Sequence, residues 1–194
     1  MDEKQGLPIL PFASPKEWEE WLDAHHATSK GLWLKIAKKD AGIPSVNYAE
    51  ALDVALCLGW IDGQKGTFDD SFWLQKFTPR GPRSKWSQVN RDKAMALIEA
   101  NRMKPAGLAA IEAAQQDGRW EAAYASQSKA TVPEDLQREL DGNPEAAAFF
   151  AALDSVNRYA VLHRIHDAKK PETRVRRIEK FIGMLNRQEK VYPK

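Results

Sequence analysis

Residues suited to ligand binding gather between positions 60 and 90 of the sequence. Arginine guanidinium groups form paired hydrogen bonds with carboxylates and phosphates, and tryptophan rings offer flat surfaces for stacking. A serine that begins a helix adds backbone amides that favour an anion. The cluster holds two arginines and a serine for the anion, two tryptophans as walls, and an aspartate and an asparagine to orient the ligand: Arg80, Arg83, Ser87, Trp60, Trp86, Asp62 and Asn90. We expect these residues to line a cleft that binds an anionic small molecule or an acidic peptide.

The same cluster has two other interpretations. In one it is structural, because Ser87 would cap a helix and Asp62 would pair with Arg80 or Arg83 to hold the sheet to that helix. In the other, the chain is an enzyme that uses Asp62 as a general base on an arginine-bound substrate. The sequence contains no P-loop, dinucleotide-binding, zincin or α/β-hydrolase motif, which weighs against an enzyme. We therefore assign no catalytic residue.

Other residues with chemical potential have simpler explanations. Cys57 lies in an apolar stretch with no histidine nearby in sequence, so we expect a buried structural thiol. Asp69 and Asp70 are typical of a turn, and their spacing fits no calcium loop. His163 and His166 are three residues apart on one helix face, but a metal site needs a third ligand. We expect neither a metal nor a cofactor.

Charge is strongly segmented along the chain. Residues 71–104 hold eight basic and two acidic residues, and residues 158–194 hold eleven basic and four acidic residues. The second segment leaves weak nucleic-acid binding open as an alternative function. Its aromatic residues have the spacing of a core rather than of base-stacking positions, and no nucleic-acid-binding motif is present, which argues against that alternative.

Periodicity and capping signals predict the elements that position these residues. Helices are expected at about 15–26, from Asn47 to Gly59, from Ser87 to about 100, and from Pro105 to about 117. Alternating patterns predict short strands at 32–37 and 72–77. Residues 60–68, with Gly63 and Gly66 and then Asp69-Asp70, predict a third strand and a turn that leads into the next strand. Beyond a polar linker, only helical patterns occur. We therefore predict an α+β fold: a small antiparallel sheet packed with helices in residues 1–125, then an all-helical region in residues 131–194.

Composition agrees with a folded, water-soluble protein. The chain has 194 residues, of which 43% are hydrophobic and 29% charged, with a net charge of +2. A single cysteine excludes a disulfide framework. No run of 18 apolar residues occurs, and the N-terminus lacks the apolar segment of a signal peptide. We expect a cytoplasmic protein that is not inserted in a membrane, and the oligomeric state stays open.

Several motifs resemble those of the YdeI/OmpD-associated family. They include CLGWIDG at 57–63, FTPRGPRSKWSQVN at 77–90, WLKIAKK at 33–39 and AKKPETRVRRIEK at 168–180. The resemblance implies an α+β N-terminal region followed by a small helical region of the OmdA type. Its family label also implies a role in bacteriocin protection, and in stress or antimicrobial protection more widely. The resemblance supplies no reaction and no catalytic residues.

Overall fold

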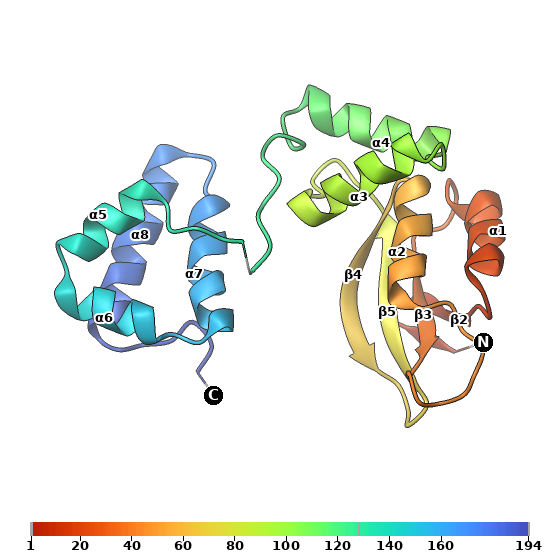
Figure 1. Cartoon of the computed structure of the whole chain (residues 1–194), viewed down its shortest axis with the longest axis horizontal. Coiled ribbons are helices and arrows are strands. Elements are labelled where there is room, and N and C mark those ends of the chain that lie inside the picture. The colour runs from red at the N-terminus through yellow and green to blue at the C-terminus, as the bar shows by residue number, and fades with distance from the viewer. Residues whose placement is uncertain (1, 128, 194) are drawn as a thin grey trace. The chain divides into compact units, whose positions relative to one another are not determined.

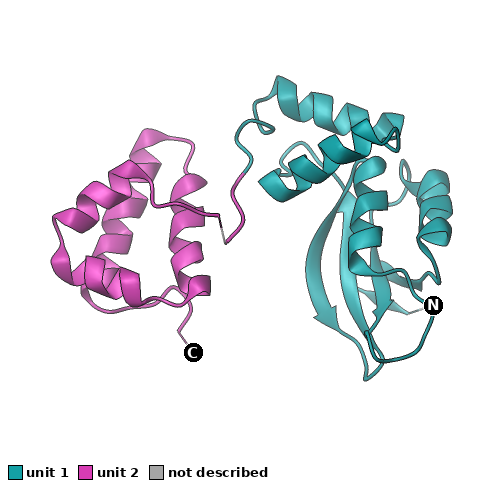
Figure 2. Cartoon of the chain, viewed as in Figure 1, with its two compact units in different colours: residues 1–123 teal, residues 124–194 magenta. Residues whose placement is uncertain are grey.

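The computed structural model describes residues 2–127 and 129–193 of the chain. These residues form two compact units, 1–123 and 124–194 (Figures 1 and 2). The first unit contains a sheet and helices, and the second contains helices and loops. The α+β fold with an all-helical C-terminal region is therefore confirmed.

The N-terminal unit is built on a five-stranded sheet with the order β1-β2-β3-β5-β4. Its strands are β1 (Glu3–Lys4), β2 (Leu7–Pro11), β3 (Leu32–Ala37), β4 (Trp60–Thr67) and β5 (Phe72–Pro79). β3, β5 and β4 are antiparallel neighbours, as expected for a small antiparallel sheet. The sheet also contains a parallel pair, β2 with β3, so it is mixed rather than wholly antiparallel. Local sequence patterns do not predict β1 or β2.

Four helices complete this unit: α1 (Pro15–His25), α2 (Tyr48–Cys57), α3 (Gln88–Glu99) and α4 (Pro105–Gln116). The predicted caps are present. The Ser14 side chain accepts a hydrogen bond from the amide of Glu17 at the start of α1. Asn47 and Glu50 form a reciprocal capping box at the start of α2. These caps satisfy amides that have no partner within the helix, and they fix where each helix begins.

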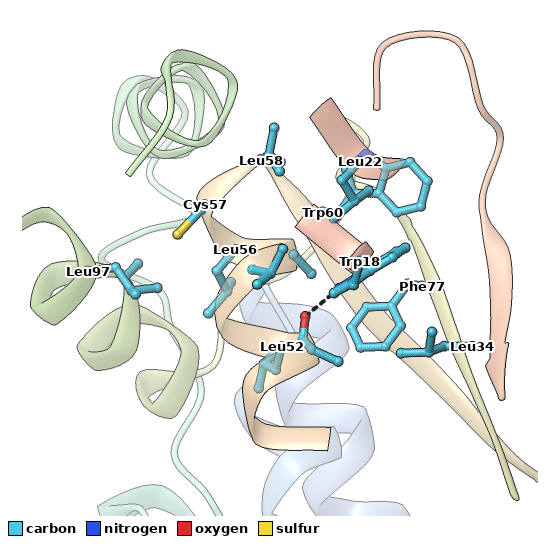
Figure 3. Close-up of a cluster of buried hydrophobic side chains, with 14 of the residues drawn as sticks. Trp18, Leu22, Leu34, Leu52, Leu56, Cys57, Leu58, Trp60, Phe77 and Leu97 are labelled. Atoms are coloured by element: carbon cyan, nitrogen blue, oxygen red, sulfur yellow. Dashed lines mark hydrogen bonds between the residues drawn. The ribbon is translucent and has the colours of Figure 1, made fainter. Parts of the chain in front are cut away.

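The core of the N-terminal unit surrounds α2. Six of the ten residues of this helix are buried, which accounts for the predominance of alanine, leucine and valine in its sequence. Helix α1 packs beside it, and the indole nitrogen of Trp18 donates a hydrogen bond to the carbonyl of Ala51 at 3.0 Å (Figure 3). Leu34 and Phe77 of the sheet belong to the same buried cluster. The helices and one face of the sheet therefore share a single core.

The C-terminal unit has a separate core formed by four helices. They are α5 (Glu134–Asp141), α6 (Pro144–Ala152), α7 (Ser155–His166) and α8 (Pro171–Asn186). Leu136, Phe150, Ile165 and Phe181 are among the residues buried between them. The unit therefore has the hydrophobic core that a domain needs in order to fold.

The close approach of α4 to α2 generates a stability prediction. A Cβ added at Gly107 would lie 2.4 Å from the carbonyl oxygen of Cys57 and 2.8 Å from that of Leu56. Gly107→Ala should therefore lower the free energy of unfolding by about 1–3 kcal/mol, because the helix must move away. Urea unfolding followed by tryptophan fluorescence measures this, since all seven tryptophans lie in residues 1–123. Gly81→Ala, where nothing lies within 4 Å, is the control. Equal stability of the two variants would contradict the packing.

The depressed pKa values of Asp135 and Asp154 indicate that acid lowers the stability of the C-terminal unit. The Arg174 side chain hydrogen-bonds Asp135 and lowers the pKa of that carboxyl. The pKa of Asp154 is lowered to about 2, chiefly by the hydrogen bond that its carboxylate accepts from the backbone amide of Asn157. Because both values are depressed in the folded state, their stabilisation is present above pH about 4, the unfolded value, and is lost as the pH falls toward 2.

The melting temperature of the helical circular dichroism signal should therefore fall between pH 4 and pH 2. Asp135→Asn should reduce the steepness of this fall, because it removes one of the two carboxyls that gain a proton. Glu139→Gln, at an exposed side chain, serves as the control substitution. A pH profile in Asp135→Asn identical to that of the wild type would refute the assignment.

Candidate functional site

The predicted arginine and tryptophan cluster centres on the loop between β5 and α3. The guanidinium carbon of Arg80 lies 3.5 Å from the centre of the Trp86 ring. Its Nη1 also donates to the carbonyl of Lys85 at 3.2 Å. The Trp86 ring is only 2% exposed and packs edge-on against Trp120, with ring centres 4.8 Å apart. Arg80 and Trp86 thus attach the loop to the core of the N-terminal unit.

Further hydrogen bonds hold the same loop. Arg119 Nη1 donates to the carbonyl of Ser84 at 2.8 Å, and the Ser84 hydroxyl accepts from the amide of Gly81 at 3.0 Å. The Ser87 hydroxyl accepts from the amide of Asn90 at 3.1 Å, which caps α3 as the sequence predicts. Asn90 itself is buried. These contacts favour a structural role for most of the loop.

The remaining members of the cluster lie in different surroundings. Trp60 is 1% exposed, and its indole nitrogen donates to the carbonyl of His26 at 3.2 Å. Asp62 is half-buried and accepts a hydrogen bond from the Tyr48 hydroxyl at 2.8 Å. Arg83 is exposed and makes no ion pair or hydrogen bond with other described residues. The structure brings Arg80, Trp86, Ser87 and Asn90 together along one loop and the start of α3. The indole rings of Trp60 and Trp86 are buried in the core.

This geometry predicts different roles for the two arginines. Arg80→Ala should lower the free energy of unfolding by about 1–2 kcal/mol, because it removes the guanidinium that covers the Trp86 ring. Arg83→Ala should change it by less than about 0.5 kcal/mol, as is usual for an exposed side chain. Urea unfolding at neutral pH compares the two variants. A larger effect at Arg83 than at Arg80 would contradict the structural role of Arg80.

A hollow of about 590 Å³ lies at the opposite end of the β4–β5 pair. We call it the lysine hollow. Its lining residues are Lys38, Lys39, Lys65, Gly66, Thr67 and Trp73. A volume of this size is within the usual range for small-molecule sites.

Strand register creates the lysine hollow. Thr67 pairs with Trp73 in the β4–β5 ladder, and Ala37 pairs with Phe72 in the β3–β5 ladder. The lysines that precede Thr67 and follow Ala37 are thereby brought to the same end of the sheet. Lys65 Nζ lies 4.4 Å from the centre of the Trp73 ring. The hollow therefore combines ammonium groups with an aromatic surface.

The lysine hollow is cationic because no carboxylate among the described residues pairs with its lysines. Lys38, Lys39 and Lys65 form no ion pair with a carboxylate in the described residues. The neighbouring Asp69 carboxylate accepts hydrogen bonds from the amides of Ser71 and Phe72, both at 2.8 Å, and so organises the turn. An anion is the species that this arrangement can attract.

Sequence reasoning missed the lysine hollow. Its residues are separated by up to 35 positions, and Lys38 and Lys39 lie just outside the strand predicted at 32–37, where no local pattern marks them as a site. The available signal was the position of Lys38 and Lys39 directly after one predicted strand, with Lys65 at the far end of another. Only the pairing of both strands with β5 shows that they meet.

Other candidate groups are explained by their surroundings. Burial raises the pKa of the Cys57 thiol, as expected for a structural rather than a nucleophilic cysteine. Within residues 2–127 and 129–193, no three histidine, cysteine, aspartate or glutamate side chains gather as metal ligands. No helix in that part of the chain is long and apolar enough to cross a membrane.

Comparison with protein families assigns both parts of the chain. Residues 10–110, just over half of the chain, match a domain of unknown function, DUF8412. Residues 129–188 match OmdA, described as bacteriocin-protection, YdeI or OmpD-associated. No curated protein and no solved structure matches the chain. The resemblance identified in the sequence is confirmed: the chain belongs to the family of this domain of unknown function and carries an OmdA domain, of the YdeI/OmpD-associated family, in its helical unit.

Proposed function

We propose that this chain is a cytoplasmic accessory protein whose N-terminal unit binds an anionic small molecule or an acidic peptide in the lysine hollow. The observation that carries the proposal is the grouping of Lys38, Lys39 and Lys65, none paired with a described carboxylate, around a hollow beside Trp73. The description of the OmdA family names bacteriocin protection. The proposed binding would serve that role, or protection against stress or antimicrobials more widely.

The chemistry of the lysine hollow determines the class of ligand. Three ammonium groups around one depression repel one another, and an anion relieves this repulsion. The lysine side chains are exposed, so solvent and salt weaken each interaction. Several charges on the ligand are therefore needed for useful affinity, and the Trp73 ring adds an apolar contact. Multivalent anions, such as polycarboxylates, polyphosphates and acidic peptides, fit these requirements.

The loop from Arg80 to Ser87 stays a predicted second location for the same ligand class. Arg83 is exposed there, and α3 begins beside it with no acidic residue in its first turn. The buried positions of Trp60 and Trp86 leave that location without the aromatic walls that the sequence suggested. We therefore place the ligand in the lysine hollow, and variants can distinguish the two locations.

Nucleic-acid binding through the C-terminal helices has less support. Arg174 of α8 forms an ion pair with Asp135, and Arg177 lies 3.9 Å from Asp167. Part of the basic charge of α8 is thus neutralised within its own unit. The enzyme alternative rests on Asp62, whose described partner is the Tyr48 hydroxyl. Among the described residues, neither alternative offers a hollow lined by several cationic side chains without carboxylate partners.

Isothermal titration calorimetry of the full chain tests the proposal. The probes are citrate, inorganic pyrophosphate and an oligoglutamate peptide at low salt. Lys38→Gln combined with Lys65→Gln should weaken binding about tenfold or more, because each lysine contributes a charge-assisted contact. Raising the salt should also weaken binding in the wild type.

The control variant combines Lys16→Gln with Lys30→Gln, two exposed lysines that do not line the lysine hollow. It removes the same charge and should bind like the wild type. Loss of binding in Arg83→Gln, with unchanged binding in the Lys38/Lys65 variant, would move the site to the loop. Failure of all three probes to bind the wild type would overturn the proposed function.

A further inference from the structure

A second hollow, of about 410 Å³, lies within the helical unit beside α7. Tyr159, His163 and Arg164 of α7 line it, together with Gln127 and with Tyr192 of the C-terminal segment. No carboxylate is among its lining residues in the described part of the chain. We call it the α7 pocket. Val156 and Ala160 complete the lining, so apart from Gln127 its side chains are aromatic, aliphatic or cationic, which restricts the kind of ligand that it can accept.

Arg164 is the charged group of the α7 pocket. Its Nη2 donates to the Tyr192 hydroxyl at 3.2 Å, while its Nη1 is buried and has no acceptor among the described residues. Arg164 forms no ion pair with a described carboxylate, whereas Arg174 pairs with Asp135 in the same unit. A buried donor without an acceptor is costly, and a half-buried guanidinium without an anion is unusual. A carboxylate in the α7 pocket would supply Arg164 with the negative partner that it lacks.

The aromatic side chains of the α7 pocket are fixed in place. The Tyr159 hydroxyl donates to the carbonyl of Ala125 at 3.0 Å, and its ring centre lies 5.5 Å from that of His163. The His163 ring also packs edge-on against Tyr124, with ring centres 5.0 Å apart. Burial raises the pKa of Tyr159, which keeps its phenol neutral. These rings form an aromatic wall next to the guanidinium.

A hydrogen bond to Asn157 of α7 fixes the position of Tyr192, which forms another wall of the α7 pocket. The Tyr192 amide donates to the Asn157 side-chain oxygen at 2.8 Å, and Asn157 is 4% exposed. The Asn157 side-chain nitrogen in turn donates to Asp154 at 3.0 Å. The C-terminal segment is therefore attached to α7, and the α7 pocket has defined walls on two sides.

We propose that the α7 pocket binds a small aromatic carboxylate. Its carboxylate would accept hydrogen bonds from Arg164, and its ring would pack against Tyr159 and Tyr192. The cationic group selects a negative charge, and the aromatic walls select a flat apolar body. This site shares no residue with the lysine hollow and lies in the other unit, so either proposal can fail without the other.

Titration of the ¹⁵N-labelled full chain with benzoate, observed by amide NMR, tests the proposal on the unmodified protein. Benzoate should shift the amides of residues 156–164 and 192 with a Kd in the millimolar range or below. Benzyl alcohol, which lacks the charge, and acetate, which lacks the ring, should each bind at least tenfold more weakly. Equal binding of either comparison compound, or no shift in these residues at 20 mM benzoate, would overturn the proposal.

Substitutions then locate the charge that binds. Arg164→Gln should weaken benzoate binding at least tenfold, and Arg164→Lys should weaken it less, because lysine keeps the charge but loses the planar guanidinium. Arg176→Gln, at an exposed arginine of α8, is the matched control and should bind like the wild type. The Lys38/Lys65 double variant should also bind benzoate normally. Benzoate affinity that is unchanged in Arg164→Gln would refute the assignment, whatever the state of the lysine hollow.

Discussion

The burial of α2 is the constraint on which the N-terminal unit depends. The helix has contacts with α1, α3, α4 and β4, so it occupies the centre of the core rather than its surface. The helix ends at Cys57, and Gly59, with a φ of 73°, turns the chain directly into β4. The carbonyl of Gly59 also accepts from the amide of Arg80 at 2.9 Å, which joins the start of β4 to the end of β5. The helix, the strand pair and the following loop are thereby fixed together.

This constraint explains why the tryptophans of the predicted cleft lie in the core. Trp60 follows the turn at the end of α2, and its ring packs edge-on against Trp18 and Trp21 of α1. Tryptophan buries a large apolar area and needs one acceptor for its nitrogen, which the carbonyl of His26 supplies for Trp60. A sequence shows that such a residue adjoins polar neighbours, but it does not show which way the ring points. Packing against α1 determines that direction.

Most of the fold could be predicted from local sequence patterns, namely helix caps and the alternation of apolar residues. The capping pairs at Ser14 and Asn47 and the alternation of residues 32–37 depend on near neighbours, so one sequence reveals them. The parallel pairing of β2 with β3 depends instead on α1, which crosses between them. Pro8 and Pro11 also interrupt the strand pattern in β2, because proline supplies no amide donor. Long-range pairing therefore sets the limit of prediction from this sequence.

The same limit applies to the binding sites. The chain contains 29 basic residues, and composition cannot show which of them the fold neutralises. The structure separates them: Arg174 and Lys93 have carboxylate partners, whereas Arg164 and Lys65 adjoin aromatic rings and form no ion pair with a described residue. A cation over a ring keeps its full charge, since the ring supplies a quadrupole and no counter-ion. Where such cations border a hollow, the remaining charge is available to a ligand, and this combination locates both proposed sites more directly than the residue types alone.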